Sequence, residues 1–135
     1  MDVRDAVESD AEVIATLADA PVDAMRAIVH DRTVRVLAVD DDVAGFVSFD
    51  VQDGDVCITQ LGGTQAACER LLAEPIRFAE REGMAVRVTV PASEEMTRSA
   101  AERVGFTEVG TGPRFDGERT VTYRLDSDDW DADAV

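Results

Sequence analysis

The sequence predicts an α/β protein of the α+β kind, with a mixed central sheet of about six to seven strands flanked by about four helices. Alternating apolar residues in the first half indicate strands joined by short turns, as in an antiparallel meander. A strand, a long helix and another strand then follow one another, and a last pair of strand patterns ends near residue 125. We expect one domain over residues 1–125 and an acidic, flexible tail over residues 126–135.

The chain is expected to begin with a short strand over residues 3–7, followed by two helices. Ser9 and Glu12 have the spacing of a capping box, which predicts that the first helix begins there. Pro21 can open the second helix, over residues 22–29, because the first turn of a helix does not use its backbone N–H groups.

Three strands are expected next, over residues 32–39, 43–51 and 55–60. A run of three aspartates separates the first two strands. Asp53 and Gly54 separate the second from the third, and this dipeptide is a strong signal for a two-residue hairpin turn. The three strands should therefore pair in antiparallel order.

A long helix is predicted over residues 64–82, because apolar residues recur there at helical spacing and Gly83 is a suitable C-terminal stop. Pro75 lies inside this helix and should kink it or split it. The next strand, over residues 86–90, alternates valines with polar residues and ends before Pro91.

A shorter helix is predicted after this strand, with Ser93 as its cap and Gly105 at its end. Its buried face should contain Met96, Ala100 and Val104. Two strands, over residues 106–109 and 120–125, are then expected to close the chain as a pair.

The charge of the chain is unusual. Its 29 acidic and 13 basic residues give a net charge of −16, every basic residue is arginine, and neither lysine nor asparagine occurs. Repulsion of this kind is largely screened near 1 M salt, where the Debye length is about 3 Å. The composition therefore resembles that of halophilic proteins, with a moderately acidic ordinary protein as the alternative. A surface of this sign argues against nucleic-acid binding, which requires a cationic footprint.

Other features limit the setting of the protein. The N-terminal residues are acidic and lack the basic region of a signal peptide, and no apolar run has the roughly 20 residues that span a membrane. Cys57 and Cys68 are the only cysteines, too few for a disulfide framework, and this fits a cytoplasmic location. One histidine, His30, without neighbouring ligands predicts no metal site.

The order and spacing of these elements resemble the GNAT family of acetyl-coenzyme A-dependent N-acetyltransferases over residues 2–125. The segment VRDAVESDAEVIATLA is similar to the opening strand and helix of the family, and the segment VAGFVSF is similar to its third strand. The long helix of the family resembles CERLLAEPIRFAEREG, and its C-terminal phrase resembles AERVGFTEVG. The resemblance implies a GNAT-like mixed sheet.

The resemblance also implies an activity. It implies acetyl-CoA as cosubstrate and transfer of the acetyl group to an amine of a small molecule or peptide, with a homodimer as a possible assembly. Two alternatives stay open, because a fold does not determine a function. One is a non-catalytic sensor that binds coenzyme A or another ligand in the same cleft, and the other is an interaction module that has kept only the fold.

The cofactor motif of the family is R/Q-x-x-G-x-G/A, and its backbone amides hold the pyrophosphate of coenzyme A. When the long helix is aligned without a gap, the basic position falls on Gly63 and the two glycine positions fall on Ala66 and Cys68. In a second alignment the motif begins at Gln60, and its first glycine position falls on Gly63. Its last position, which requires glycine or alanine, then falls on Gln65 and does not match. The resemblance implies cofactor contacts from Ile58, Thr59, Gln60, Gly63, Thr64, Gln65, Ala66, Ala67 and Cys68.

The departures from the motif concern glycine and positive charge. Since backbone amides at a helix N-terminus bind the phosphate, alanine or cysteine can replace glycine where φ stays negative. The lost basic residue would remove a charge-assisted hydrogen bond, for which Arg70 is a candidate replacement. We expect the chain still to bind coenzyme A, with a lower affinity than a protein that has the complete motif.

The catalytic residues cannot be assigned from the sequence. The tyrosine that often serves the family as general acid falls on Ala101, and the asparagine of the same helix falls on Glu94. Acetyl transfer also requires a base or a water relay to remove a proton from the amine. Asp55, Thr59 and Glu94 are candidates for the base by position alone.

Overall fold

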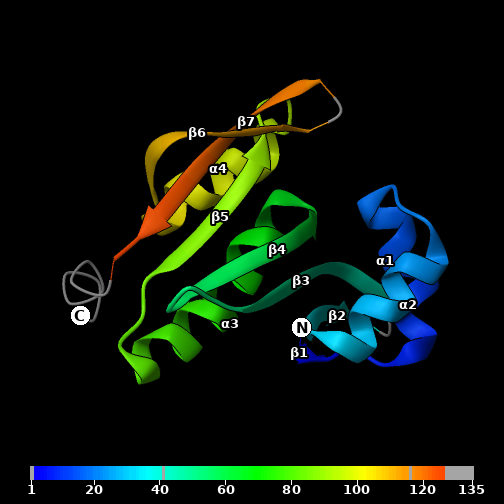
Figure 1. The fold of residues 1–135 in the computed structure, drawn as a ribbon. Coiled ribbons are helices and arrows are strands. Elements are labelled where there is room, and N and C mark those ends of the chain that lie inside the picture. Colours follow the sequence, from blue (N-terminus) through cyan, green and yellow to red (C-terminus); the bar gives the residue numbers. More distant parts are fainter. Residues whose placement is uncertain (1, 41, 116, 127–135) are drawn as a thin grey trace.

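The computed structural model describes residues 2–40, 42–115 and 117–126, which form one seven-stranded sheet with helices on both faces (Figure 1). In chain order the elements are β1 (Asp2–Asp5), a 3-10 helix (Glu8–Asp10), α1 (Ala11–Ala18), α2 (Val22–Asp31), β2 (Thr33–Val39), β3 (Asp42–Gln52), β4 (Asp55–Gly63), α3 (Gln65–Glu82), β5 (Val86–Pro91), α4 (Glu95–Val104), β6 (Thr107–Phe115) and β7 (Glu118–Leu125). The predicted fold class is confirmed. Residues 127–135 of the predicted tail lie outside the described residues.

The strands lie in the order β1-β2-β3-β4-β5-β7-β6. β4 and β5 are parallel, and every other neighbouring pair is antiparallel. The predicted hairpin turn is confirmed, because Asp53 and Gly54 join β3 to β4 with positive φ angles of 54° and 81°. None of the helices among the described residues is long and apolar enough to cross a membrane.

Apolar residues on both faces of the sheet explain how it is covered by helices. Val36 and Phe46 belong to the cluster that packs with α1 and α2. Their chain neighbours Leu37 and Val47 belong to the cluster that packs with α3 and α4. Because successive side chains of a strand point to opposite faces, the two helix pairs cover opposite faces of the sheet.

Pro75 does not split α3, which runs without a break from Gln65 to Glu82, so this part of the prediction is wrong. Pro75 is buried, as are Leu71 and Leu72. A proline inside a helix costs about 3 kcal/mol, whereas each large apolar side chain that is buried gains about 1.5–3 kcal/mol. Burial of this helix face therefore offsets the backbone hydrogen bond that Pro75 cannot make.

The predicted capping box at the first helix is wrong. Ser9 lies within the 3-10 helix, and α1 begins at Ala11. The carboxylate of Asp10 instead accepts a hydrogen bond from Val7 N–H at 2.8 Å and pairs with Arg4 at 2.8 Å. Asp10 can do so because it is largely buried at this corner.

The predicted start and buried face of α4 also require correction. Glu94, not Ser93, directly precedes the helix, and no side chain caps it. Met96 is 51% exposed, whereas Ala100 and Ala101 are fully buried. Met96 is therefore wrong as a core residue, whereas Ala100 is buried and Val104 packs against the core, as predicted. Gly105 also ends the helix as predicted.

Candidate functional site

The parallel strands β4 and β5 separate part-way along their length. Their pairing covers only Val56 to Ile58 and Val86 to Val88, although β4 continues to Gly63 and β5 to Pro91. Figure 1 shows the two strands diverging beyond this point. The facing backbone groups beyond Ile58 and Val88 therefore have no partner from the other strand, and an extended ligand could pair with them.

A bulge in β4 lies at the point of divergence. Phe49 pairs with Ile58 and Ser48 pairs with Gln60, which leaves Thr59 as the extra residue. The hydroxyl of Thr59 donates to the carbonyl oxygen of Ser48 at 3.1 Å and lies 2.9 Å from its Oγ. Bulges of this kind bend a strand and change the direction of its edge, which fits the separation from β5.

The N-terminus of α3 lies next to this gap, directly after β4. Thr64 is the N-cap residue, and its Oγ1 accepts a hydrogen bond from Ala67 N–H at 3.1 Å. The amides of Gln65 and Ala66 belong to the first turn, which has no intrahelical acceptors. With the positive end of the helix dipole, these two amides form a potential phosphate site.

Close backbone packing holds this loop in place. Gly63 has φ +122°, and a Cβ atom added there would lie 2.4 Å from the carbonyl oxygen of Ala44. A Cβ atom on Gly45 would lie 2.9 Å from Cβ of Ala67. Small residues at these positions let the start of α3 lie directly against β3.

The turn between β5 and α4 borders the same region. Glu94 in this turn has a raised pKa, first because of desolvation by burial and second because of the negative charge of Glu118. The charge of Glu94 also contributes to the raised pKa of Cys68, which lies in the first turn of α3.

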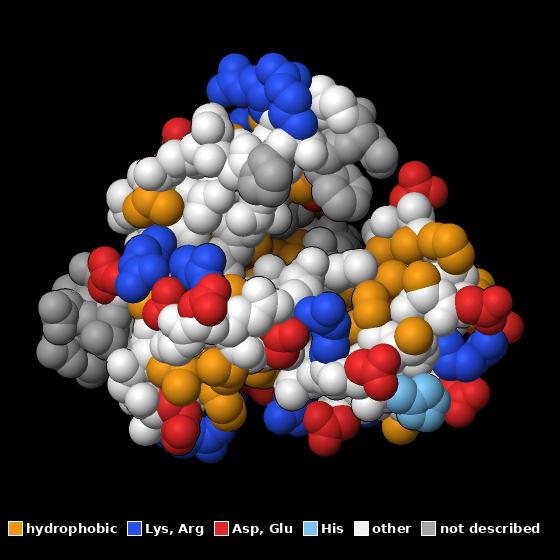
Figure 2. Space-filling view, in the orientation of Figure 1, with side chains coloured by type: hydrophobic (Ala, Val, Ile, Leu, Met, Phe, Trp, Pro, Cys, Tyr) orange, Lys and Arg blue, Asp and Glu red, His pale blue; other side chains and the backbone are white. Residues whose placement is uncertain are grey.

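A hollow in the surface extends along this region. Figure 2 shows it between the part of the surface formed by β5, β6 and β7 and the part formed by α1 and α2. Apolar side chains line its floor in this view. A second molecule could thus approach the gap between β4 and β5 from this side.

Solved structures match this arrangement over nearly the whole chain. A protein described as an acetyltransferase of the GNAT family, from Desulfovibrio desulfuricans, is 18% identical with a TM-score of 0.74, covering 93% of this chain and 98% of that one. The ribosomal-protein-alanine N-acetyltransferase of Brucella melitensis is 17% identical with a TM-score of 0.74, covering 93% and 99%. A protein described as an acetyltransferase from Salmonella typhimurium, solved with its cofactor acetyl-CoA, is 17% identical with a TM-score of 0.74, covering 94% of each chain. The chain has the GNAT fold.

A comparison with models of protein families found no match, and neither did a comparison with curated protein sequences. The structural similarity at these identities concerns the fold. The side chains at the GNAT-like site must therefore be considered one by one.

The structure explains two of the departures from the GNAT motif. Gly63, on which the basic position of the motif falls, has no space for a side chain. Ala66 and Cys68, on which the glycine positions fall, both have negative φ, since the described non-glycine residues with positive φ are Asp19, Asp40 and Asp53. Neither position therefore needs the conformational freedom of glycine.

The predicted cofactor residues lie in β4, the loop after it and the first turn of α3, next to the gap. They differ in whether their side chains could contact a ligand. The side chains of Ile58, Ala67 and Cys68 are buried in the core. Thr64 and Ala66 are exposed, and the side-chain amide of Gln65 donates to Glu69 at 3.3 Å. A ligand at this GNAT-like site would therefore meet mainly backbone groups from these residues.

Arg70 is not brought to the loop. It lines a small polar pocket between α3 and the start of β1, together with Asp2, Val3, Glu74 and Arg77. None of the loop residues lines this pocket, so the structure gives no support to Arg70 as the replacement for the missing basic residue.

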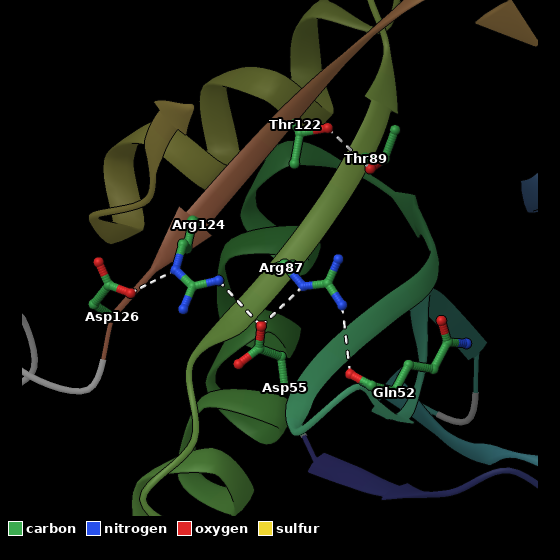
Figure 3. Close-up of polar contacts among 7 residues, drawn as sticks. All are labelled: Gln52, Asp55, Arg87, Thr89, Thr122, Arg124 and Asp126. Atoms are coloured by element: carbon green, nitrogen blue, oxygen red, sulfur yellow. Dashed lines mark hydrogen bonds and ion pairs between the residues drawn. The ribbon is translucent and has the colours of Figure 1, made fainter. Parts of the chain in front are cut away.

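Two of the three candidate bases have other roles. Figure 3 shows Asp55 at the other end of β4, where its Oδ2 accepts from both Arg87 and Arg124 at 3.1 Å. These arginines hold the carboxylate in place on the sheet. The Thr59 hydroxyl donates within β3 and β4, as described above. Glu94 alone combines a position next to the gap with a raised pKa.

The tyrosine position of the GNAT fold has no equivalent group. Ala101 is fully buried on α4, and the single tyrosine, Tyr123, is buried on β7, as expected for a sheet residue. The hydroxyl of Tyr123 donates to Glu102 at 2.8 Å and accepts from Arg98 at 3.2 Å. Its hydroxyl therefore joins β7 to α4 through Arg98 and Glu102.

Cys68 should be an unreactive thiol in the folded protein. Its side chain is 1% exposed, and burial, with the charges of Glu94 and Glu69, raises its pKa to about 11. At pH 8 its thiolate fraction is then at least about a hundredfold below that of a free cysteine with a pKa near 8.5. We expect Cys68 in a Cys57→Ser variant to react at least about a hundredfold more slowly with Ellman's reagent than the same protein does after unfolding. An equal rate would show that Cys68 is accessible.

Proposed function

We propose that the protein is an acetyl-CoA-dependent N-acetyltransferase that transfers the acetyl group to an amine of a small molecule or peptide. One observation carries this proposal. The parallel strands β4 and β5 separate beyond Ile58 and Val88, directly next to the uncapped amides of α3. The Salmonella protein with the same fold was solved with acetyl-CoA, which supports the choice of cosubstrate.

The residues present fit this cosubstrate. The free edge of β4 would pair with the amide groups of the extended pantetheine arm, which resembles the addition of a strand. The amides of Gln65 and Ala66 would hold the pyrophosphate with the help of the helix dipole. Since Gly63 has no space for a side chain, a basic side chain at this position cannot contribute to binding of the anion.

Glu94 is the group best placed to act as the base. When the amine nitrogen forms its bond to the acetyl carbon and the bond to sulfur breaks, the nitrogen must lose a proton. A carboxylate with a raised pKa accepts that proton more effectively than one with an ordinary pKa. The proton then passes to solvent or to the sulfur, so the products are an amide and a thiol.

The fold of the chain is also compatible with a non-catalytic sensor of coenzyme A, and one observation favours this second candidate. Ala101 is packed in the core where the resemblance implies a tyrosine as general acid, and no other described side chain occupies that position. A protein without this group could bind the cofactor and release no product.

Ligand binding and turnover separate these candidates. At multi-molar salt, acetyl-CoA at about 100 times its dissociation constant should raise the stability by about 2.7 kcal/mol and the thermal midpoint by about 8–10 °C. Thiol release would then be measured with a polyamine, an aminoglycoside and a peptide with a free α-amine. No shift at millimolar acetyl-CoA would contradict both candidates, and a shift without thiol release would favour the sensor.

A Glu94→Gln variant tests the proposed base. We expect kcat to fall about a hundredfold, because general-base catalysis contributes about 10²–10⁴-fold, while the thermal shift with acetyl-CoA is kept. Glu95→Gln, an exposed neighbour on the same helix, is the matched control and should keep its kcat. Equal turnover in both variants would exclude Glu94 as the base.

A further inference from the structure

The turn that carries Glu94 is held from two sides. Ala92 N–H donates to the carbonyl oxygen of Arg119 at 2.8 Å, and Ser93 N–H donates to Oε2 of Glu118 at 3.0 Å. On the other side, Nη1 of Arg98 donates to the carbonyl oxygen of Ala92 at 3.0 Å. These contacts connect the turn formed by residues 92–94, which lies between β5 and α4, to β7 and to α4.

The first two contacts continue the pairing of β5 with β7. The last pair of that ladder is Pro91 with Thr120, so Ala92 falls opposite Arg119 and Ser93 falls opposite Glu118. At Ser93 the acceptor is the side chain of Glu118 rather than a backbone carbonyl. The carboxylate thus ends the ladder and lets the chain turn into α4.

The same carboxylate is electrostatically coupled to Glu94. The charge of Glu118 is the second cause of the raised pKa of Glu94, after desolvation. The charge of Glu94 in turn contributes to the raised pKa of Cys68 on α3. On α4, Glu95 follows Glu94 in the chain, and the backbone N–H of Arg98 donates to the carbonyl oxygen of Glu94 at 3.1 Å. Arg98 is not among the causes of the pKa shift of Glu94, and its guanidinium donates to the carbonyl oxygen of Ala92 and to the hydroxyl of Tyr123.

A nearby negative charge disfavours the ionised form of a carboxylate. The hydrogen bond from Ser93 N–H fixes the position of the Glu118 carboxylate. We propose that Glu118 is a positioning residue for Glu94, because its carboxylate holds Ser93 N–H and so fixes the turn that carries Glu94. The effect on turnover rests on the proposed acetyl transfer, whereas the coupling of the two carboxylates does not.

Two substitutions separate the hydrogen bond from the charge. In Glu118→Gln the side-chain oxygen can still accept from Ser93 N–H, but the negative charge is gone. In Glu118→Ala both are lost. Removing a like charge favours the ionised form of Glu94, so its pKa should fall in both variants.

The titration of the Glu94 side-chain carboxyl, followed by ¹³C NMR at one fixed salt concentration, measures this directly. We expect its midpoint to move to lower pH in both variants and to move much less in Glu95→Gln, the control, because Glu95 is not among the charges that raise the pKa of Glu94. Thiol release from acetyl-CoA, with the best acceptor of the three amines named above, should show the acid limb of kcat/KM moving in the same direction.

The hydrogen bond from Ser93 N–H is lost in Glu118→Ala and kept in Glu118→Gln, so its effect should appear as a difference in kcat between these two variants. We expect kcat to fall about tenfold in Glu118→Ala, because the base is displaced, while KM for acetyl-CoA stays within about twofold and Glu118→Gln keeps most of the rate. An unchanged Glu94 midpoint in both variants, or a full kcat in Glu118→Ala, would overturn the proposal. If the unmodified protein releases no thiol with any amine, acetyl transfer fails as the function, and the NMR midpoint in Glu118→Gln alone decides whether Glu118 controls Glu94.

Discussion

Replacing Ala66 with aspartate is expected to lower the affinity for acetyl-CoA by about a thousandfold while the fold stays at least as stable. Ala66 is exposed in the first turn of α3, where the proposed pyrophosphate site lies. A carboxylate about 4 Å from a phosphate charge costs about 4 kcal/mol at an effective dielectric constant of 20. The same carboxylate is favourable for the helix itself, because it lies at the positive end of the dipole.

Ala66→Asn is the matched control, since asparagine has the shape of aspartate without its charge. Calorimetric titration with acetyl-CoA, at one salt concentration for all variants, would measure the affinities, and thermal unfolding without ligand would measure the stability. We expect Ala66→Asn to lose much less affinity than Ala66→Asp. Equal affinity in the two variants would place the pyrophosphate elsewhere and would contradict the proposed contacts of Gln65 and Ala66.

Periodicity and turn signals were sufficient to predict most of the fold. The hairpin at Asp53 and Gly54 is a local signal, since the dipeptide itself favours the positive φ angles that the turn requires. The stop of α3 at Gly83 is a signal of the same kind. Pro75 was misjudged because its effect depends on what the helix face buries, and burial is a property of the whole core.

The candidate site was predicted less completely than the fold. The start of α3 at Thr64 can be found from the sequence, because threonine is a favoured N-cap residue. The separation of β4 from β5 and the bulge at Thr59 depend on strand register, which no short motif specifies. The coupling of Glu94 to Glu118 joins the turn after β5 to the start of β7, which come together only in the folded protein, so sequence spacing gives no sign of it.

The missing basic residue of the cofactor loop is another feature that the sequence and the structure explain differently. From the sequence, glycine at position 63 is a loss of positive charge. In the structure, a side chain at Gly63 would collide with the backbone of β3, so the charge could not have been placed there without moving the loop. The loop thus combines close backbone packing with phosphate binding by amides.

Gly63→Ala should therefore be among the most destabilising single substitutions in this chain, with an expected loss of at least about 3 kcal/mol. Two effects contribute. The φ of +122° is a conformation that residues with a Cβ rarely adopt, and the new Cβ would lie 2.4 Å from the carbonyl oxygen of Ala44 and 2.6 Å from Cα of Gly45. Both contacts are with backbone atoms, which cannot move aside as the end of a flexible side chain can.

Gly83→Ala provides the control that separates these two effects. Gly83 also has a positive φ, of 69°, but an added Cβ would meet no atom within 4 Å. We expect this variant to lose only about 1–2 kcal/mol, the cost of the left-handed conformation without the collision. Urea unfolding at a fixed, high salt concentration would measure both values. If the two variants were equally stable, the close contact of the loop with β3 would not exist, and the position of the α3 N-terminus next to the gap between β4 and β5 would lose its structural basis.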